Sequence, residues 1–183
     1  MKKILNVLLF AALYFVGFLA AAFIGFFHPF CYLFFGIFAA ALCAWPYAKL
    51  SEKHPVPGMA LTCVALMIII YVVAGEVNAE KQFFVWGSLL LGLVAEAILA
   101  VAGHGSRKGI VLSYLPMSLI PFTLVQFMWA SPTHMYDETV EEMGAEYADA
   151  MQPLFHGWLE AGMIALTLVI ACFCVRFFVR ERK

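Results

Sequence analysis

The sequence predicts an all-α, polytopic membrane protein with six transmembrane helices, both termini in the cytoplasm, and an amphipathic external helix between helices five and six. Three observations predict this fold class. Hydrophobic residues make up 64% of the 183 residues and charged residues only 13%, with a mean hydropathy of +0.93, a balance that one soluble core of this size cannot bury. The apolar residues fall into six long runs, and the cationic residues gather on one side of them.

Each apolar run is long enough to cross a bilayer, because a helix needs about 20 apolar residues to do so. The predicted spans cover residues 4–27, 30–48, 56–75, 82–102, 110–130 and 157–175. We therefore predict a single membrane domain over 1–183, with an external lid segment over 131–156. We expect the first run to be retained, because it continues well past the roughly 7–15-residue core of a signal peptide.

The distribution of Lys and Arg predicts the orientation, since short cytoplasmic loops retain these residues. With the N-terminus inside, only Lys81 lies on the outer side. The inner cations are Lys2, Lys3, Lys49, Lys53, Arg107, Lys108, Arg176, Arg180, Arg182 and Lys183. Most carboxylates fall on the outer side, which agrees with this orientation.

The segment over 131–156 has the pattern of an amphipathic helix. Tyr136, Val140, Met143, Tyr147 and Met151 recur at helical spacing, and the acidic residues lie mostly on the other face. We expect the apolar stripe to pack on the mouth of the bundle while the acids face water, as a lid over a cavity would. The alternative is an ordered loop that merely caps the bundle.

Two features of the spans concern helix packing. Pro116 and Pro121 each remove a backbone donor and free the carbonyl four residues earlier, so we expect a kinked helix that faces protein or a cavity. Gly17, Ala21 and Gly25 place three small residues on one face of the first helix, where another helix can approach closely. Contact with a partner and packing inside the chain both stay open for this face.

Glu96 is the only carboxylate well inside a predicted span. Placing an ionisable side chain at this depth costs free energy, so Glu96 is a candidate functional residue. It lies towards the inner end of the fourth helix. A structural hydrogen bond is favoured over a proton relay, because no second buried acid or histidine is expected beside it.

Aromatic and polar side chains gather at the outer rim of the predicted bundle, as they do around small-molecule pockets. The candidate substrate-binding residues are Gln126, Trp129, His134, Met135, Tyr136, His156, Trp158 and Glu160. Because Trp and Tyr also form belts at membrane interfaces, such a belt is the alternative interpretation.

The sequence shows no pattern for catalysis or nucleotide binding: it has no catalytic triad in motif context, no metalloprotease helix and no phosphate-binding glycine loop. We expect no catalytic residues, no metal site, no resident cofactor, no nucleic-acid partner and no ATPase activity. His28, His134 and His156 are ligand types found on iron porphyrins, so haem or a metal chelate stays open as a bound ligand.

The chain resembles the Trep-Strep family of bacterial integral membrane proteins, which is grouped with the substrate-binding (S) components of energy-coupling factor transporters. The resemblance spans nearly the whole chain. Its most specific parts are Gly144-Ala145-Glu146-Tyr147-Ala148-Asp149-Ala150, Gly92-Leu93-Val94-Ala95-Glu96 and the short basic inner loop that follows.

The resemblance implies a subunit of the bacterial cytoplasmic membrane that captures a micronutrient from outside. It would dock on a transmembrane coupling protein and two cytoplasmic ATPases. Gly17, Ala21 and Gly25 match the positions that contact the coupling protein in such components. The substrate would lie under the outer loops and against helices four to six, and the loaded subunit would topple within the membrane during transport.

Two other roles stay open. A membrane-embedded enzyme or biogenesis factor acting on a lipid or tetrapyrrole would carry a buried polar cluster near the inner interface. A purely structural protein would have no outer cavity. The substrate is not identified, although the acidic outer segment disfavours anionic ligands through long-range repulsion.

Overall fold

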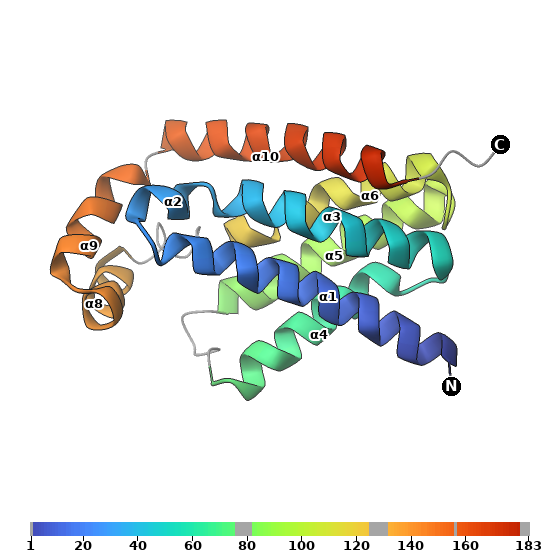
Figure 1. Cartoon of the computed structure of the whole chain (residues 1–183), viewed down its shortest axis with the longest axis horizontal. Coiled ribbons are helices and arrows are strands. Elements are labelled where there is room, and N and C mark those ends of the chain that lie inside the picture. The colour runs from blue at the N-terminus through green and yellow to red at the C-terminus, as the bar shows by residue number, and fades with distance from the viewer. Residues whose placement is uncertain (1, 76–81, 125–131, 156, 180–183) are drawn as a thin grey trace.

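The computed structural model describes residues 2–75, 82–124, 132–155 and 157–179, and these residues confirm the all-α class (Figure 1). The helices are α1 (Lys2–Gly25), α2 (Pro29–Leu33), α3 (Phe35–Lys53), α4 (Met59–Val73), α5 (Gln82–Ala102), α6 (Arg107–Ser118), α8 (Pro132–Met143), α9 (Ala145–Met151), the 3-10 turn η1 (Gln152–Leu154) and α10 (Gly157–Phe178).

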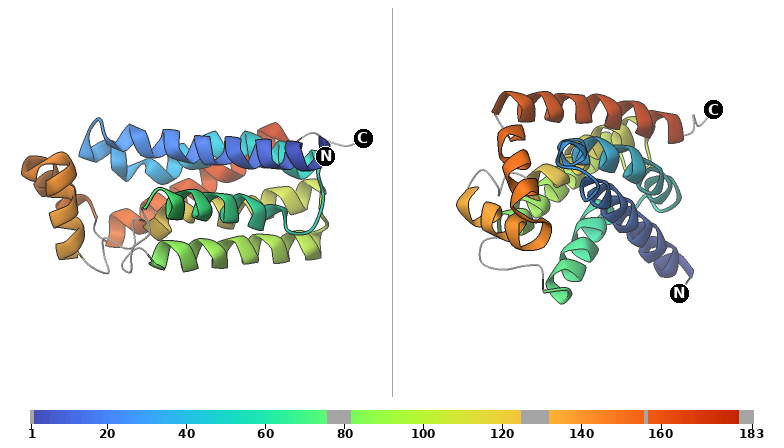
Figure 2. Two further views of the ribbon diagram at one scale, coloured as in Figure 1. Left: turned by 90° about the horizontal axis from the view of Figure 1, so that it is seen from below. Right: turned by 60° about the vertical axis from the view of Figure 1, so that its left-hand side comes forward.

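The long helices run broadly along one axis of the molecule (Figures 1 and 2). Helices α8 and α9 lie across one end of the bundle, and both termini lie at the opposite end. The termini therefore share one end, as the six-span topology requires. Which side of the membrane this end faces stays a prediction from the charges.

Within the described ranges, three helices are long and apolar enough to cross a membrane: α1 over Ile4–Gly25, α5 and α10. The second predicted span is divided, because α2 ends at Leu33 and α3 begins at Phe35. Helix α4 has 15 residues and is about 22 Å long, shorter than the predicted run. In the fifth predicted span α6 ends at Ser118, and the chain is helical again from residue 120.

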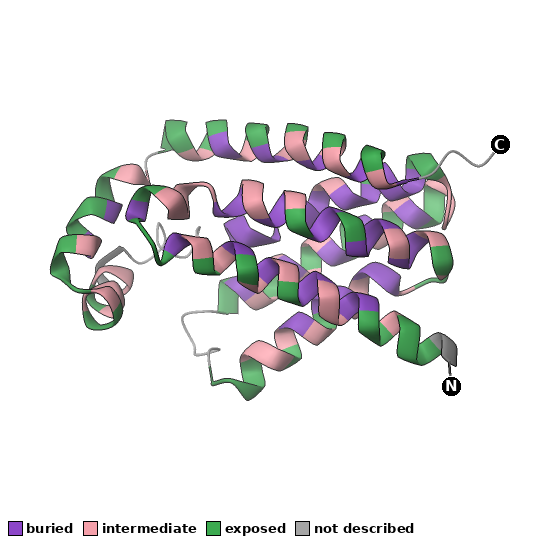
Figure 3. Cartoon of the chain, viewed as in Figure 1, coloured by how far each residue is buried: buried purple, intermediate pink, exposed green. Residues whose placement is uncertain are grey.

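The outward faces of the helices are exposed and their inward faces are buried (Figure 3). Many of the exposed residues are large and hydrophobic. Val101 is 91% exposed and Phe177 is 78% exposed. Contact between so many exposed apolar side chains and water would be unfavourable, whereas their contact with lipid tails is favourable. This surface fits a protein that is surrounded by membrane.

Helix α3 packs against α1, α6 and α10 and so forms the centre of the bundle. Three buried tyrosines connect the helices around it. Tyr47 Oη donates to Ser113 Oγ at 2.8 Å, and Tyr114 Oη donates to the carbonyl of Ala40 at 2.6 Å. Because an unpaired hydroxyl is costly away from water, these bonds fix how α3 and α6 pack.

The third buried tyrosine explains how the proline in the fifth span is tolerated. Pro121 has no N–H, so the carbonyl of Met117 lacks its usual helical donor. Tyr14 Oη, on α1, donates to this carbonyl at 3.1 Å. Another helix thus supplies the donor that Pro121 lacks, and the interruption at Leu119 agrees with the predicted kink in this span.

Replacing Tyr14 with phenylalanine should lower the free energy of unfolding by about 1 kcal/mol, because the Met117 carbonyl loses the hydroxyl donor from α1 in an apolar environment. SDS titration of the purified protein in mixed micelles measures the change. Tyr136→Phe is the matched control, since its hydroxyl bonds Asp149 at an exposed site. Equal losses in the two variants would contradict this role of Tyr14.

Charge is separated along the long axis of the bundle. The end that holds the termini also holds the last turn of α3, the first turn of α6 and the last turn of α10 (Figure 1). Lys53, Arg107, Lys108 and Arg176 lie in these turns. Lys49 Nζ donates to the carbonyl of Phe178 at 3.0 Å and so ties α3 to the end of α10. The acidic α8 and α9 lie at the other end.

Candidate functional site

A cavity of about 470 Å³ lies between the bundle and the cover formed by α8 and α9. Its volume falls in the range of small-molecule sites, roughly 300–1,000 Å³. The lining residues are Phe15, Leu19, Ala22, Phe23, Gly25, Phe26, Tyr32, Ile70, Tyr71, Ala74, Phe84, Leu124, Met135, Glu138, Thr139, Glu142, Met143, Tyr147 and Met151. Helices α1 and α4 and the cover supply most of them.

Seven of the nineteen residues that line this cavity are aromatic. On α1, Phe15, Leu19 and Ala22 follow helical spacing and therefore present one face to the cavity. The ring of Tyr71, on α4, lies 6.2 Å from that of Phe15 and 5.0 Å from that of Phe84. These contacts hold three helices together around the cavity.

The cover consists of two helices rather than the single external helix that the pattern predicts. Gly144 separates them with a φ of +90°, a backbone conformation that favours glycine. Tyr147 Oη, on α9, donates to the carbonyl of Gly25 at 2.6 Å. This carbonyl lies in the last turn of α1, where helical donors run out. This hydrogen bond connects the cover to the bundle.

The predicted apolar stripe of the cover does face the bundle, since Met143, Tyr147 and Met151 line the cavity. The prediction that the acids face water holds for Asp137, Glu141, Glu146 and Asp149, which are exposed. It holds for Glu142, which is also exposed, and it is wrong for Glu138, which is only partly exposed. Both residues line the cavity and lie four residues apart on α8, so they share the face that borders it.

Tyr136, on α8, contacts the other helix of the cover, α9. Its hydroxyl donates to Asp149 Oδ1 at 2.7 Å and joins α8 to α9. The hydrogen bond to this carboxylate also raises the pKa of Tyr136 above its ordinary value. Tyr136 therefore holds the two cover helices together and does not line the cavity.

Of the predicted binding residues whose side chains are described, Met135 lines the cavity. Trp158 is 92% exposed, and Glu160 lines a much smaller hollow beside Phe122 and Phe155. Gln126, Trp129 and His156 lie outside the described residues, and His134 lies in α8 at a position whose side chain is not described. Substrate binding by these residues stays a prediction.

The main walls, on α1 and α4, were not among the predicted site residues. Local hydropathy indicates where helices lie along the chain but not which helices become neighbours. The available signal was the recurrence of aromatic residues on the outer halves of both helices, such as Phe15 on α1 and Tyr71 on α4.

The small residues of α1 pack inside the chain. Ala21 is 0% exposed, and a Cβ at Gly17 would meet Cys43 Sγ of α3 at 3.3 Å. A Cβ at Gly25 would overlap the ring of Tyr32. In this structure, therefore, this face of α1 packs against other helices of the same chain. A partner could reach these residues only if α1 separated from α3, so partner contact through them stays a prediction.

Of the three histidines considered as porphyrin ligands, His28 is the one whose side chain lies among the described residues. His28 Nδ1 accepts from the N–H of Phe30 at 3.1 Å and caps α2. His28 does not line the cavity. Across the described part of the chain, no three His, Cys, Asp or Glu side chains lie where they could hold one metal ion.

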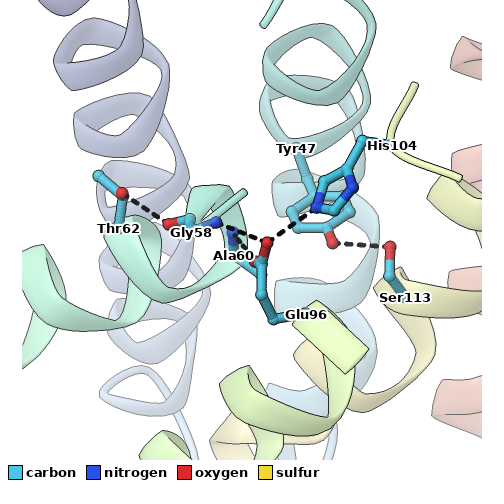
Figure 4. A network of polar contacts seen from close by, with 7 residues as sticks. All are labelled: Tyr47, Gly58, Ala60, Thr62, Glu96, His104 and Ser113. Atoms are coloured by element: carbon cyan, nitrogen blue, oxygen red, sulfur yellow. Dashed lines mark hydrogen bonds and ion pairs between the residues drawn. The ribbon is translucent and has the colours of Figure 1, made fainter. Parts of the chain in front are cut away.

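A second polar cluster lies towards the end of the bundle that holds the termini (Figure 4). Glu96 Oε1 accepts from the N–H of Gly58 at 2.6 Å, and Oε2 accepts from the N–H of Ala60 at 3.0 Å. Gly58, the N-cap of α4, has no side chain with which to cap the helix. Glu96 therefore caps α4 from α5, a stabilising position for an anion.

The predicted structural hydrogen bond of Glu96 is thus observed, but the expectation that no histidine lies beside it is wrong. His104 Nε2 lies 3.1 Å from Glu96 Oε1. Gly103 and Gly105 flank this histidine with φ values of +95° and +77°. The turn that they form brings His104 back onto the helix that precedes it.

The comparisons with known proteins agree with this membrane fold. A family model described as a hypothetical bacterial integral membrane protein (Trep_Strep) matches residues 1–178. Neither the curated proteins nor the solved structures provide a match to the chain. The chain therefore belongs to the Trep_Strep family of bacterial integral membrane proteins.

Proposed function

We propose that this protein is the substrate-capturing membrane subunit of an energy-coupling factor type uptake transporter. The observation that carries the proposal is the cavity of about 470 Å³ beneath a latched cover, at the end of the bundle away from both termini. With the charge-based orientation, this cavity lies towards the outside. A subunit that collects a micronutrient needs such a chamber on that side.

The lining residues suggest how capture would work. The aromatic walls from α1, α4 and α5 would bury the apolar part of the nutrient, and the polar side chains of α8 would orient it. Closing α8 and α9 over the ligand would exclude water. The Tyr147–Gly25 hydrogen bond is one contact that opening would have to break.

In this proposal the subunit is not an enzyme and has no ATPase of its own. A transmembrane coupling protein and two cytoplasmic ATPases would supply the energy of ATP hydrolysis. Lipid surrounds the apolar outer face of the bundle. If Gly17, Ala21 and Gly25 contact the coupling protein, α1 must first leave α3.

Copurification tests the proposal. The affinity-tagged chain is coexpressed with the coupling protein and ATPases of its source bacterium, solubilised in mild detergent and purified. We expect all four subunits in one complex, together with uptake that requires ATP after reconstitution into liposomes. A chain that is folded and abundant but is recovered without the coupling protein would overturn the proposal.

The enzyme or biogenesis-factor alternative receives less support. The Glu96 cluster is a partly buried polar group near the predicted inner interface, where this alternative requires a buried one. However, both carboxylate oxygens already accept backbone N–H groups at the start of α4. Both oxygens of the Glu96 carboxylate thus help to hold the fold, which favours a structural role for this cluster.

A further inference from the structure

We propose that the cavity under the cover takes an organic cation: an amine or quaternary ammonium group carried on an apolar or aromatic body. This inference rests on the proposed function, because it treats the cavity as the substrate site. It adds the chemical class of the substrate, which comes from the charges and rings that line the cavity.

The first step is the sign of the charge. Glu138 and Glu142 both line the cavity, and among the described residues no Lys, Arg or His lines it. Like charges four residues apart on a helix destabilise it, an effect that a cation between them relieves. An anionic ligand would add a third negative charge in the same space.

The second step is the aromatic wall. Phe15, Tyr71 and Phe84 form a continuous set of rings on three helices, and Tyr32 and Tyr147 add two more rings near the cover. The negative faces of aromatic rings attract cations, most strongly when water is excluded. The same rings bury apolar surface. A bare metal ion would gain little from such walls, whereas an organic cation uses both properties.

The third step is size and placement. A volume of about 470 Å³ is far larger than an ion and suits a molecule of vitamin-like dimensions. The two carboxylates come from α8, whereas the rings come mostly from the bundle. The charged group of the ligand would therefore lie against the cover and its apolar body would extend towards α4 and α5. Binding would draw α8 onto the bundle.

Three probes of the same shape test the charge. They are the trimethylammonium, tert-butyl and sulfonate derivatives of methylbiphenyl, which are cationic, neutral and anionic. Binding to the purified chain in detergent is measured by equilibrium dialysis against matched empty micelles. We expect the cation to bind the wild type at least about tenfold more tightly than the neutral probe, and the anion to bind most weakly.

The matched variants are Glu138→Gln with Glu142→Gln, and Glu141→Gln with Glu146→Gln. The first pair removes the carboxylates that line the cavity, and the second removes two carboxylates of the same cover that do not line it. We expect the first pair to abolish the preference for the cation and the second to preserve it. The inference is overturned if the wild type does not prefer the cation, or if both pairs lose the preference equally.

Binding is measured on the isolated chain, so this test is separate from copurification with the coupling protein. Cation binding without a transporter complex would retain the ligand class and overturn the uptake role. A complex that forms while the wild type shows no preference for the cation would do the opposite.

Discussion

Replacing Glu96 with alanine should lower the free energy of unfolding by about 3 kcal/mol, the largest effect that we expect from a single side chain here. The variant leaves the N–H groups of Gly58 and Ala60 without their acceptor, and it removes the partner of His104. Because α4 begins with a glycine that cannot cap it, its first turn should open before the rest of the bundle.

The cysteines of the protein provide a local measurement of this opening. Cys63 lies on α4 three residues after Ala60 and is 0% exposed, while Cys43 lies on α3 and is 2% exposed. In single-cysteine backgrounds, a thiol-reactive fluorophore should label Cys63 much faster in Glu96→Ala than in the parent, with a smaller change at Cys43. Equal labelling of Cys63 in variant and parent would contradict the capping role.

A matched control uses another carboxylate at the same end of the bundle. Glu52 lies 2.7 Å from Lys49 on the same helix, in a partly exposed ion pair. Such pairs contribute about 0–1 kcal/mol, so Glu52→Ala should have a small effect. Glu96→Gln should be intermediate, because its amide offers one acceptor oxygen where the carboxylate offers two.

Replacing Gly25 with alanine should destabilise the isolated protein by about 2 kcal/mol, although alanine favours helices more than glycine does. The new methyl group would overlap the ring of Tyr32 near its attachment to the backbone, where the side chain cannot simply swing away. Tyr32 stacks on Phe35 with ring centroids 5.8 Å apart and also contacts Phe155 at 6.2 Å. All three rings would have to shift.

Gly162→Ala is the matched control for this variant. Gly162 lies inside α10, and a Cβ there would have no atom within 4 Å. Alanine should therefore be neutral or stabilise the helix by about 0.5–1 kcal/mol. SDS titration of both variants measures the difference. If Gly25→Ala proved as stable as the parent but failed to copurify with a coupling protein, Gly25 would serve a partner rather than the internal packing.

The helical segments of the bundle could be predicted because hydropathy depends on local composition. The predicted span at 82–102 has the bounds of α5, Gln82–Ala102. The division between α2 and α3 could not be predicted, since Phe34 interrupts the helix without any glycine or proline at that position. The rotation of α8 could not be predicted either: Glu138 and Glu142 belong to the acidic set, and only the packing of α8 places them beside the cavity.

The contacts of Glu96 differ in how far they could be predicted from the sequence. Gly58 lies 38 residues from Glu96 along the chain, so no local pattern could join them. His104 lies only eight residues away, and the glycines on both sides of it signalled a tight turn. That signal was available in the sequence, and it would have identified the histidine beside the partly buried Glu96.

The separation of charge along the bundle has an electrical consequence. With the cationic end in the cytoplasm, an inside-negative voltage favours this orientation, since carrying one elementary charge across the whole field costs about 2.3 kcal/mol per 100 mV. The field therefore acts in the same direction as the loops that retain Lys and Arg. Any motion that tilts the bundle and carries Lys53 or Arg107 into the field would do work against the membrane potential.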